Sequence, residues 1–371
     1  MSDALHILHI DTDLTWRGGQ QQAASLIKQL HRMKQKNVIV SPPDSEFLNR
    51  IPKEHSICRP VRMRGDWDVF SAYSIARIIR QEAIDVIHAH SARAHTLAVL
   101  AKRIFRIPAP VVVSRRVDFP IRSSIFSKWK YQNADFYIPI SKNVAELLAQ
   151  AGVPPNKMEI VYSSVDGDRF AHANGRAVRK EFSIDENSIV IGNIGVCEER
   201  KCQQVILEAA SLALQKAPNV HFFIVGDGSL RQKLMQLSRQ LNIQDHVHFP
   251  GFRTDVGDFL DAFDIFVFVP NLEGLGSSIL DAQFFSLPVI ATPIGGIPEI
   301  VLDHETGMLI PVNAPEHLAQ RILDLIDSPP LRKRLGGAGR RRVQECFLST
   351  SMAEKTLKIY QKTLNEFTKF Q

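Results

Sequence analysis

The segment from residue 265 to residue 282, IFVFVPNLEGLGSSILDA, decides how we expect the chain to fold. Ile265–Val269 is a continuous apolar run, which predicts a strand buried on both faces of a parallel sheet. Glu273 and Gly276 follow in a short loop, and a predicted helix opens at Ser277. Backbone N–H groups at a helix start are unpaired, and the helix dipole there favours negative charge. The segment therefore predicts a phosphate-binding turn with a carboxylate beside it.

Strand and helix signals alternate along the chain in two series. In the first series, apolar strands are predicted at 5–11, 38–40, 85–88, 111–113 and 136–138. Helical patterns lie near 20–35, 70–83, 92–106, 122–132 and 142–150. In the second series, the strands are predicted at 189–192, 222–225, 247–249, 265–269, 289–291 and 308–310. The helices lie near 201–217, 229–241, 254–262, 277–286, 315–327 and 331–345. This alternation is typical of doubly wound parallel sheets, so the predicted fold class is α/β.

Two domains are expected, because 371 residues are too many for one ordinary core. The polar, glycine-bearing stretch 165–172 is the predicted linker. We assign 1–168 to a first domain and 169–349 to a second, and we predict a last helix near 350–366. Ligands of open α/β sheets bind at the carboxyl ends of the strands, so two such domains facing each other across a cleft suit a ligand with two unlike ends.

The composition is that of a soluble globular protein, with 44% apolar and 23% charged residues. No apolar run approaches the roughly 20 residues that span a bilayer, and the N-terminus offers no signal peptide. The four cysteines have neither disulfide-framework nor metal-type spacing. We therefore expect a cytoplasmic protein with reduced cysteines.

Positive charge is concentrated in the first half of the chain. Residues 1–165 hold 23 basic and 14 acidic side chains, whereas residues 166–371 hold 22 and 25. A basic half attracts nucleic acid, an anionic membrane or a phosphorylated acceptor, but a solvated surface explains it equally well. Segment 122–131 mixes cations with aromatic residues, which suits an anionic membrane or an ordinary core face. No nucleic-acid module surrounds it, so nucleic acid is not an expected partner.

Two motifs follow predicted strands of the first half. Gly18 and Gly19 form a turn that lets a phosphate or sugar approach the backbone closely. His88 and His90 fall on the same side of one strand, and their spacing suits a metal. No third ligand is evident, so the alternative is a pair of buried structural histidines.

Arg116 and Asp118 follow the next strand. The guanidinium suits an anionic acceptor or a donor phosphate, and the carboxylate could orient it or accept a proton from the acceptor. Structural ion pairing explains the two residues equally well.

The chain resembles the GT-B glycosyltransferases of family 4 in several of these motifs. Their acidic signature has two acids eight positions apart, which Glu273 and Asp281 match, although the usual second acid is Glu. Gly18–Gly19 resembles the glycine loop of their first domain. Lys201 stands where these enzymes have the lysine that grips the donor diphosphate, whereas Val196 stands at the position of their arginine. The resemblance covers nearly the whole chain and implies two Rossmann-like domains, with the C-terminal helix, about 350–371, packing back on the first.

The resemblance also implies a reaction and its residues. A retaining transfer would move a sugar from a nucleotide diphosphate sugar, with uridine as the default base, to a hydroxyl of a glycan or lipid-linked acceptor, without a cofactor or an obligatory metal. The expected catalytic residues are Lys201 and Glu273. The expected contacts of the donor diphosphate and sugar are Gly18, Gly19, Arg200, Lys201, Glu273, Leu275, Gly276 and Ser277. The expected ribose and base contacts are Asp281, Phe252 and Arg253, and those of the acceptor or sugar are His90, Arg116 and Asp118.

Two alternatives stay open. A nucleotide-sugar epimerase of GT-B fold would need no acceptor, and a catalytically silent nucleotide-sugar-binding protein is suggested by the missing arginine at Val196, unless Arg200 supplies that charge. A dinucleotide-dependent oxidoreductase is disfavoured, because no Gly-x-Gly-x-x-Gly turn follows the first strand. The basic first half suggests an acceptor of envelope polysaccharide or lipopolysaccharide synthesis, reached from the cytoplasmic face of the inner membrane as a peripheral protein.

Overall fold

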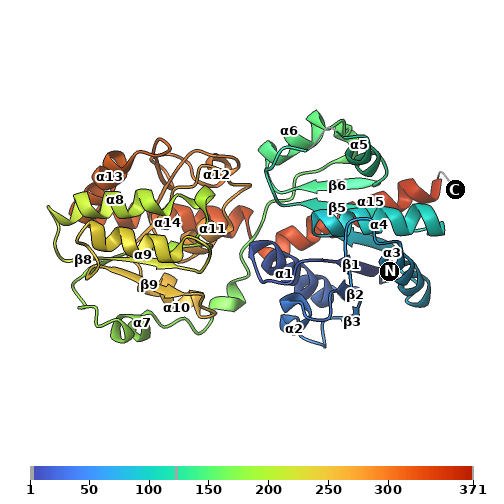
Figure 1. Ribbon diagram of the computed structural model, residues 1–371, viewed down its shortest axis with the longest axis horizontal. Helices are drawn as coiled ribbons and strands as arrows, with labels where there is room; N and C mark the ends of the chain where they lie inside the picture. The colour runs from blue at the N-terminus through green and yellow to red at the C-terminus, as the bar shows by residue number, and fades with distance from the viewer. Residues whose placement is uncertain (1–3, 122–123, 370–371) are drawn as a thin grey trace. The chain divides into compact units, whose positions relative to one another are not determined.

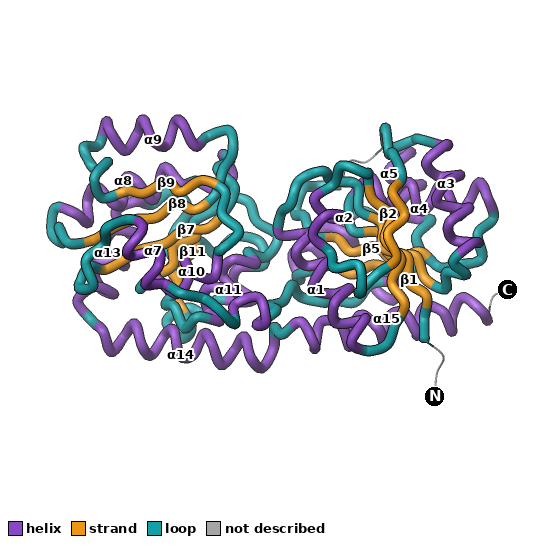
Figure 2. Tube along the Cα trace, turned by 90° about the horizontal axis from the view of Figure 1, so that it is seen from below, coloured by secondary structure: helices purple, strands orange, loops and turns teal. Residues whose placement is uncertain are grey.

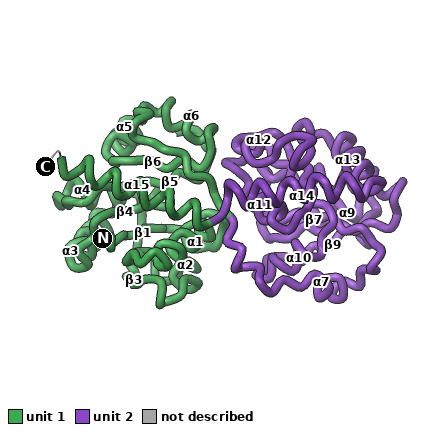
Figure 3. The backbone as a smooth tube through the Cα atoms, turned by 180° about the vertical axis from the view of Figure 1, so that it is seen from behind, with its two compact units in different colours: residues 1–164, 349–371 green, residues 165–348 purple. Residues whose placement is uncertain are grey.

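The structure, a computed structural model, describes residues 4–121 and 124–369. It divides into two compact units (Figure 3): unit 1 comprises Met1–Ser164 and Ser349–Gln371, and unit 2 comprises Val165–Leu348. Each unit holds one six-stranded parallel sheet with helices on both of its faces (Figure 1, Figure 2). The predicted α/β class is therefore confirmed.

The sheet of unit 1 has the strand order β3-β2-β1-β4-β5-β6, and all neighbouring strands are parallel. The strands are β1 (His6–Ile10), β2 (Lys36–Ser41), β3 (Ile57–Pro60), β4 (Val86–Ala89), β5 (Val111–Arg115) and β6 (Phe136–Pro139). The helices are α1 (Gly18–Arg32), α2 (Glu46–Arg50), α3 (Val69–Gln81), α4 (Ala92–Phe105), α5 (Ile125–Gln132), α6 (Lys142–Gln150) and α15 (Ser349–Lys369). The strand order reverses between β1 and β4, which is where open α/β sheets bind ligands.

Successive residues of these strands pack into two different cores. Leu8 of β1 packs with residues of α3 and α4, whereas its neighbour Ile7 packs with Leu26 of α1 and Tyr360 of α15. Both faces of the sheet are thus covered, which explains why its strands read as continuous apolar runs. Helix α15 belongs to unit 1 although it follows unit 2 in the sequence, because its apolar face completes this second core.

The sheet of unit 2 has the strand order β12-β11-β10-β7-β8-β9, and its switch point lies between β7 and β10. The strands are β7 (Ile189–Ile194), β8 (Val220–Val225), β9 (Val247–Gly251), β10 (Ile265–Phe268), β11 (Val289–Ala291) and β12 (Gly307–Leu309). The helices are α7 (Gly175–Glu181), α8 (Gln203–Leu214), α9 (Arg231–Gln240), α10 (Val256–Ala262), α11 (Ser277–Phe284), α12 (Ile297–Ile300), α13 (Pro315–Asp327) and α14 (Pro329–Cys346). Short 3-10 turns are η1 (Pro155–Lys157), η2 (Gly167–Phe170) and η3 (Glu199–Lys201).

Several short elements were not predicted, namely α2, β3, α7 and α12. Strand β3 lies at the sheet edge and is mostly exposed, so it has no apolar run. The helix predicted from residue 201 begins at Gln203 instead, because Cys202 adopts the left-handed conformation (φ 51°) and separates η3 from α8. The helix predicted near 122–132 is described from Ile125 onward; residues 122 and 123 lie outside the described part of the chain.

Candidate active site

Lys201 and Glu273, the two predicted catalytic residues, form an ion pair in unit 2. Lys201 ends the turn η3 after β7, and Glu273 lies in the loop after β10, so the switch point of the sheet brings them together. Their side chains are only 12% and 14% exposed. The ammonium also lies 4.6 Å from the ring centre of Phe268. The Asn271 N–H donates to the carbonyl of Arg200 at 3.0 Å, which ties the two loops to each other.

The helix predicted at Ser277 begins there, after a glycine in the left-handed conformation. Gly276 has φ 88° and ψ 62°, and no side chain caps the first turn of α11. A side chain at this position would be strained, and its Cβ would lie 3.1 Å from Ile279 and 3.2 Å from Phe268. Leu275 is buried below this turn. The Ile279 N–H donates to the Gly276 carbonyl at 2.9 Å, and a helix start without a side-chain cap can bind an anion through its first N–H groups.

Asp281 lies on the second turn of α11 and already has a cationic partner. Arg169 of η2 approaches its carboxylate at 3.7 Å, between Nη1 and Oδ1. Burial raises the pKa of Asp281 to about 6, although Arg169 opposes this shift. Turn η2 also packs on α11 through rings, with Phe170 and Phe284 at 5.9 Å between centroids. Arg169 was not among the predicted site residues, since nothing in the sequence of the linker marks it as a partner of this acid.

The other predicted nucleotide contacts do not converge on Lys201 through their side chains. Arg200 pairs with Glu198, with 3.1 Å between Nε and Oε2. Phe252 is 54% exposed just after β9. Arg253 forms ion pairs with Glu181 at 2.8 Å and with Asp255 at 2.7 Å, and the hydrogen bonds within these pairs raise its pKa.

Gly18 and Gly19 are the first residues of α1 in unit 1, whereas the sequence had predicted a loop there and a helix from residue 20. Gln20 closes this helix start: its Oε1 accepts from the Arg17 N–H at 3.2 Å, and its Nε2 donates to Asp11. Burial raises the pKa of Asp11 to about 6. A Cβ on Gly19 would lie 3.8 Å from Cδ of Arg116, so this arginine lies beside the helix start.

The strands bring a third imidazole, that of His9, to the predicted histidine pair; the sequence pattern had not made this residue evident. Register pairs His9 of β1 with His88 of β4. His9 Nδ1 lies 3.0 Å from His90 Nε2, and His9 Nε2 lies 3.1 Å from the side chain of Asn37. Three nitrogens of the group lie within 4.8 Å of one another, which is close enough for one metal ion.

The surroundings of this group favour neutral, hydrogen-bonded imidazoles. His88 contacts the hydroxyls of Tyr360 at 2.6 Å and Ser114 at 2.8 Å. Burial lowers the pKa of His9 to about 4 and lowers those of His88 and His90 well below the usual value. Nη1 of Arg116 lies 3.2 Å from His90 Nδ1, and a guanidinium at that distance repels a cation. Asp118 is also buried at this end of the sheet.

Comparisons with known proteins identify the family of the chain. The family model for Glycosyltransferase Family 4 matches residues 16–169, and the model for Glycosyl transferases group 1 matches residues 175–342. The N-acetyl-alpha-D-glucosaminyl L-malate synthase of Bacillus anthracis is 24% identical over 307 residues, which cover 81% of this chain and 80% of that protein. The lipopolysaccharide core biosynthesis glycosyltransferase LpsE of Rhizobium meliloti is 29% identical over 269 residues, which cover 71% of this chain and 72% of the relative.

A solved structure shows the same fold. Anabaena HepE, crystallised with UDP and glucose, superposes with a TM-score of 0.84 at 19% sequence identity, over 96% of this chain and 100% of that one. The two family models together match the chain from residue 16 to residue 342 with a short gap, and the sheets of both units have the topology that this fold requires. The protein therefore belongs to the family-4 glycosyltransferases, enzymes of the GT-B fold.

Proposed function

We propose that the protein is a retaining glycosyltransferase that uses a UDP-linked sugar and a hydroxyl of a glycan or lipid-linked acceptor in envelope polysaccharide or lipopolysaccharide synthesis. The observation that carries this proposal is the Lys201–Glu273 pair beside the uncapped start of α11, at the carboxyl end of β10. A cation, a helix start without a side-chain cap and a carboxylate meet there. This set suits a diphosphate joined to a sugar.

The reaction breaks the bond between the anomeric carbon and the phosphate oxygen, and the electron pair leaves with the diphosphate. Lys201 and the N–H groups of α11 stabilise the negative charge that develops on it. Glu273 holds hydroxyls of the transferred sugar. The acceptor oxygen attacks from the face that the diphosphate leaves, and the departing phosphate takes the acceptor proton. Such front-face transfer retains the anomeric configuration and needs no protein base.

The remaining donor contacts follow from the same turn. Asp281 would accept hydrogen bonds from the ribose hydroxyls, with Arg169 holding its carboxylate in place. The crystal structure of HepE with UDP and glucose supports uridine as the base. The role of LpsE in lipopolysaccharide core synthesis supports an acceptor of the cell envelope. The proposed acceptor side comprises His90, Arg116 and Asp118 of unit 1.

We also propose that the protein binds an anionic membrane from its cytoplasmic side, and an exposed aromatic surface of unit 1 supports the membrane contact. Phe70, Ile125 and Phe126 are 86%, 84% and 65% exposed. Trp67, itself 48% exposed, lies 5.1 Å from Phe126 between ring centroids, so α5 and the loop before α3 form one surface. Aromatic rings with neighbouring cations such as Lys128 are typical of interfacial contacts.

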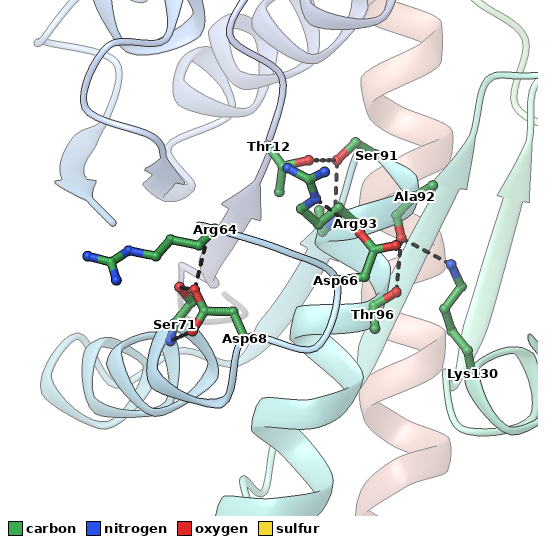
Figure 4. A network of polar contacts seen from close by, with 11 residues as sticks. Thr12, Arg64, Asp66, Asp68, Ser71, Ser91, Ala92, Arg93, Thr96 and Lys130 are labelled. Atoms are coloured by element: carbon green, nitrogen blue, oxygen red, sulfur yellow. Dashed lines mark hydrogen bonds and ion pairs between the residues drawn. The ribbon is translucent and has the colours of Figure 1, made fainter. Parts of the chain in front are cut away.

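The loop that carries Trp67 is fixed on both sides (Figure 4). Asp66 pairs with Arg93 of α4 at 3.0 Å, and Asp68 accepts from the Ser71 N–H at 3.1 Å as the cap of α3. These contacts hold the residues on either side of Trp67. Flotation with vesicles of anionic lipid at low salt tests this part: the protein should float with them, whereas Phe70→Ser/Phe126→Ser should not. Binding that both proteins share equally would refute it.

A thermal-shift screen with nucleoside diphosphates tests the donor part. We expect UDP to raise the Tm more than ADP, GDP or CDP, and UDP-sugars to be hydrolysed slowly to UDP when no acceptor is present. Incubation with a UDP-sugar alone also distinguishes the epimerase, since an epimerase would return a different UDP-sugar and no free UDP. A protein that bound none of these nucleotides would contradict the proposal.

A further inference from the structure

The carboxyl end of β5 carries cations that have no carboxylate partner. Arg115 is the last residue of β5, Arg116 follows it, and Lys130 of α5 lies close by. Within residues 4–121 and 124–369, none of these three side chains forms an ion pair with an acid. In unit 2, by contrast, Lys201, Arg169 and Arg200 each have one.

The hydrogen bonds of these three cations go to neutral groups. Arg115 donates to the hydroxyl of Tyr131 at 2.7 Å and to the carbonyl of Phe119. Lys130 donates to the carbonyl of Ala92 at 3.1 Å, so it reaches from α5 to the start of α4 (Figure 4). Arg115 and Lys130 thus tie this end of the sheet together.

Arg116 has the least compensated charge of the three. Its described partner is the neutral ring of His90, and its Nε atom is buried without any hydrogen bond. Burial lowers its pKa to about 10. The acid that acts on it is Asp11, but that carboxylate is held by Gln20, and it forms no ion pair with the guanidinium among the described residues. The residue as a whole is only partly buried, but a guanidinium that has no ion pair among the described residues lowers the stability of the empty protein.

Two features of the surroundings of Arg116 suit an anion. The start of α1 lies beside it, since a Cβ on Gly19 would be 3.8 Å from its side chain. The same side chain borders a small cavity of about 10 Å³, room for one water molecule, together with the hydroxyls of Ser114, Ser163 and Thr356. The histidines next to it are neutral and do not compete for the anion.

We propose that Arg116 binds an anionic group, a phosphate or a carboxylate, of the acceptor. This inference rests on the proposed function, because it takes unit 1 as the acceptor side. It deepens that function by giving the acceptor a negative charge. The planar guanidinium offers two parallel N–H donors, a geometry that fits both kinds of anion.

Inorganic phosphate is the first probe, at ionic strength matched with chloride. We expect it to raise the Tm of the full chain by about 3–6 °C at ten times its dissociation constant. Arg116→Gln should bind phosphate at least tenfold more weakly, and Arg116→Lys should fall between the two. Arg103→Gln, at an exposed position of α4, is the matched control and should behave as the wild type does. Glycerol 1-phosphate and glucuronate, used as further probes, distinguish a phosphate ester from a carboxylate.

A second readout separates binding from a structural role. Because the guanidinium forms no ion pair with a described carboxylate, Arg116→Gln should raise the Tm in chloride, whereas removal of a structural arginine would lower it. The proposal is overturned if Arg116→Gln binds phosphate with an affinity within twofold of the wild type, or if the Tm of this variant in chloride falls. It is also overturned if saturating UDP abolishes phosphate binding, since the bound anion would then be that of the donor. A protein that binds phosphate at Arg116 but does not bind UDP would contradict the proposed donor and leave this site intact.

Discussion

Replacing Lys201 with methionine separates the two roles of the Lys201–Glu273 pair. Methionine keeps most of the side-chain volume and removes the charge. In the reaction, loss of one cation that stabilises the leaving diphosphate should lower kcat by about 10²–10³, which corresponds to about 2.7–4 kcal/mol. In the resting protein, Glu273 is left without its partner at 14% exposure. An unpaired carboxylate that is this well buried should destabilise unit 2 by about 1–3 kcal/mol, or roughly 2–8 °C in Tm.

The assay measures UDP release from the donor that the thermal-shift screen identifies, with Tm recorded for the same samples. Lys201→Met/Glu273→Gln removes the orphaned charge as well, so it should recover the Tm but not the activity. Lys216→Met, at an exposed lysine just beyond α8, controls for the loss of a positive charge elsewhere. A folded Lys201→Met protein with kcat within threefold of the wild type would show that Lys201 does not hold the diphosphate.

Three further outcomes are expected. Burial raises the pKa of Asp281 to about 6, so its carboxylate is protonated at lower pH. UDP affinity measured by calorimetry should therefore fall below about pH 6 and be level above pH 7. An affinity that is flat from pH 5 to pH 8 would contradict a ribose contact. Arg169 lowers that pKa, so Arg169→Gln should move the midpoint of the UDP–pH curve upward, and an unchanged midpoint would mean that the 3.7 Å pair is without effect. Gly192→Ala should lower the free energy of unfolding by about 1–3 kcal/mol, and with it the Tm, because its Cβ would lie 1.9 Å from the ring of Phe263. Gly195→Ala, whose Cβ would lie 3.9 Å from Phe268, should change the Tm little.

The fold could be predicted because its signals are local, and Lys201 and Glu273 could be singled out because they match positions of the family-4 motifs. Each strand of the core is a continuous apolar run, and the glycine turn before Ser277 has a fixed spacing from Glu273. Lys201 follows the first strand of unit 2, and parallel sheets place the ends of successive strands along one edge. Pattern and topology therefore lead to the same pair.

The missed contacts depend on which strands and turns become neighbours. His9 meets His88 only because β1 pairs with β4 in a register that the sequence does not display. Arg169 meets Asp281 because η2 packs on α11. The guanidinium of Arg253 pairs with Glu181 of α7, a helix that the hydrophobic pattern did not reveal; the predicted nucleotide contact of Arg253 stays a prediction. Contacts between side chains that are distant in sequence depend on how the elements pack, and the sequence pattern does not display that packing.

The way charges are compensated differs between the two units, and this difference bears on how each would bind its substrate. Glu273 neutralises Lys201 in the empty protein and also keeps the ammonium in place. An incoming diphosphate must therefore share or take over that ammonium, and the same event releases Glu273 to accept hydrogen bonds from the sugar. One exchange of partners would thus prepare both ends of the donor. Arg116 forms no ion pair with an acid among the described residues, so under our proposal the negative charge at that site arrives with the substrate.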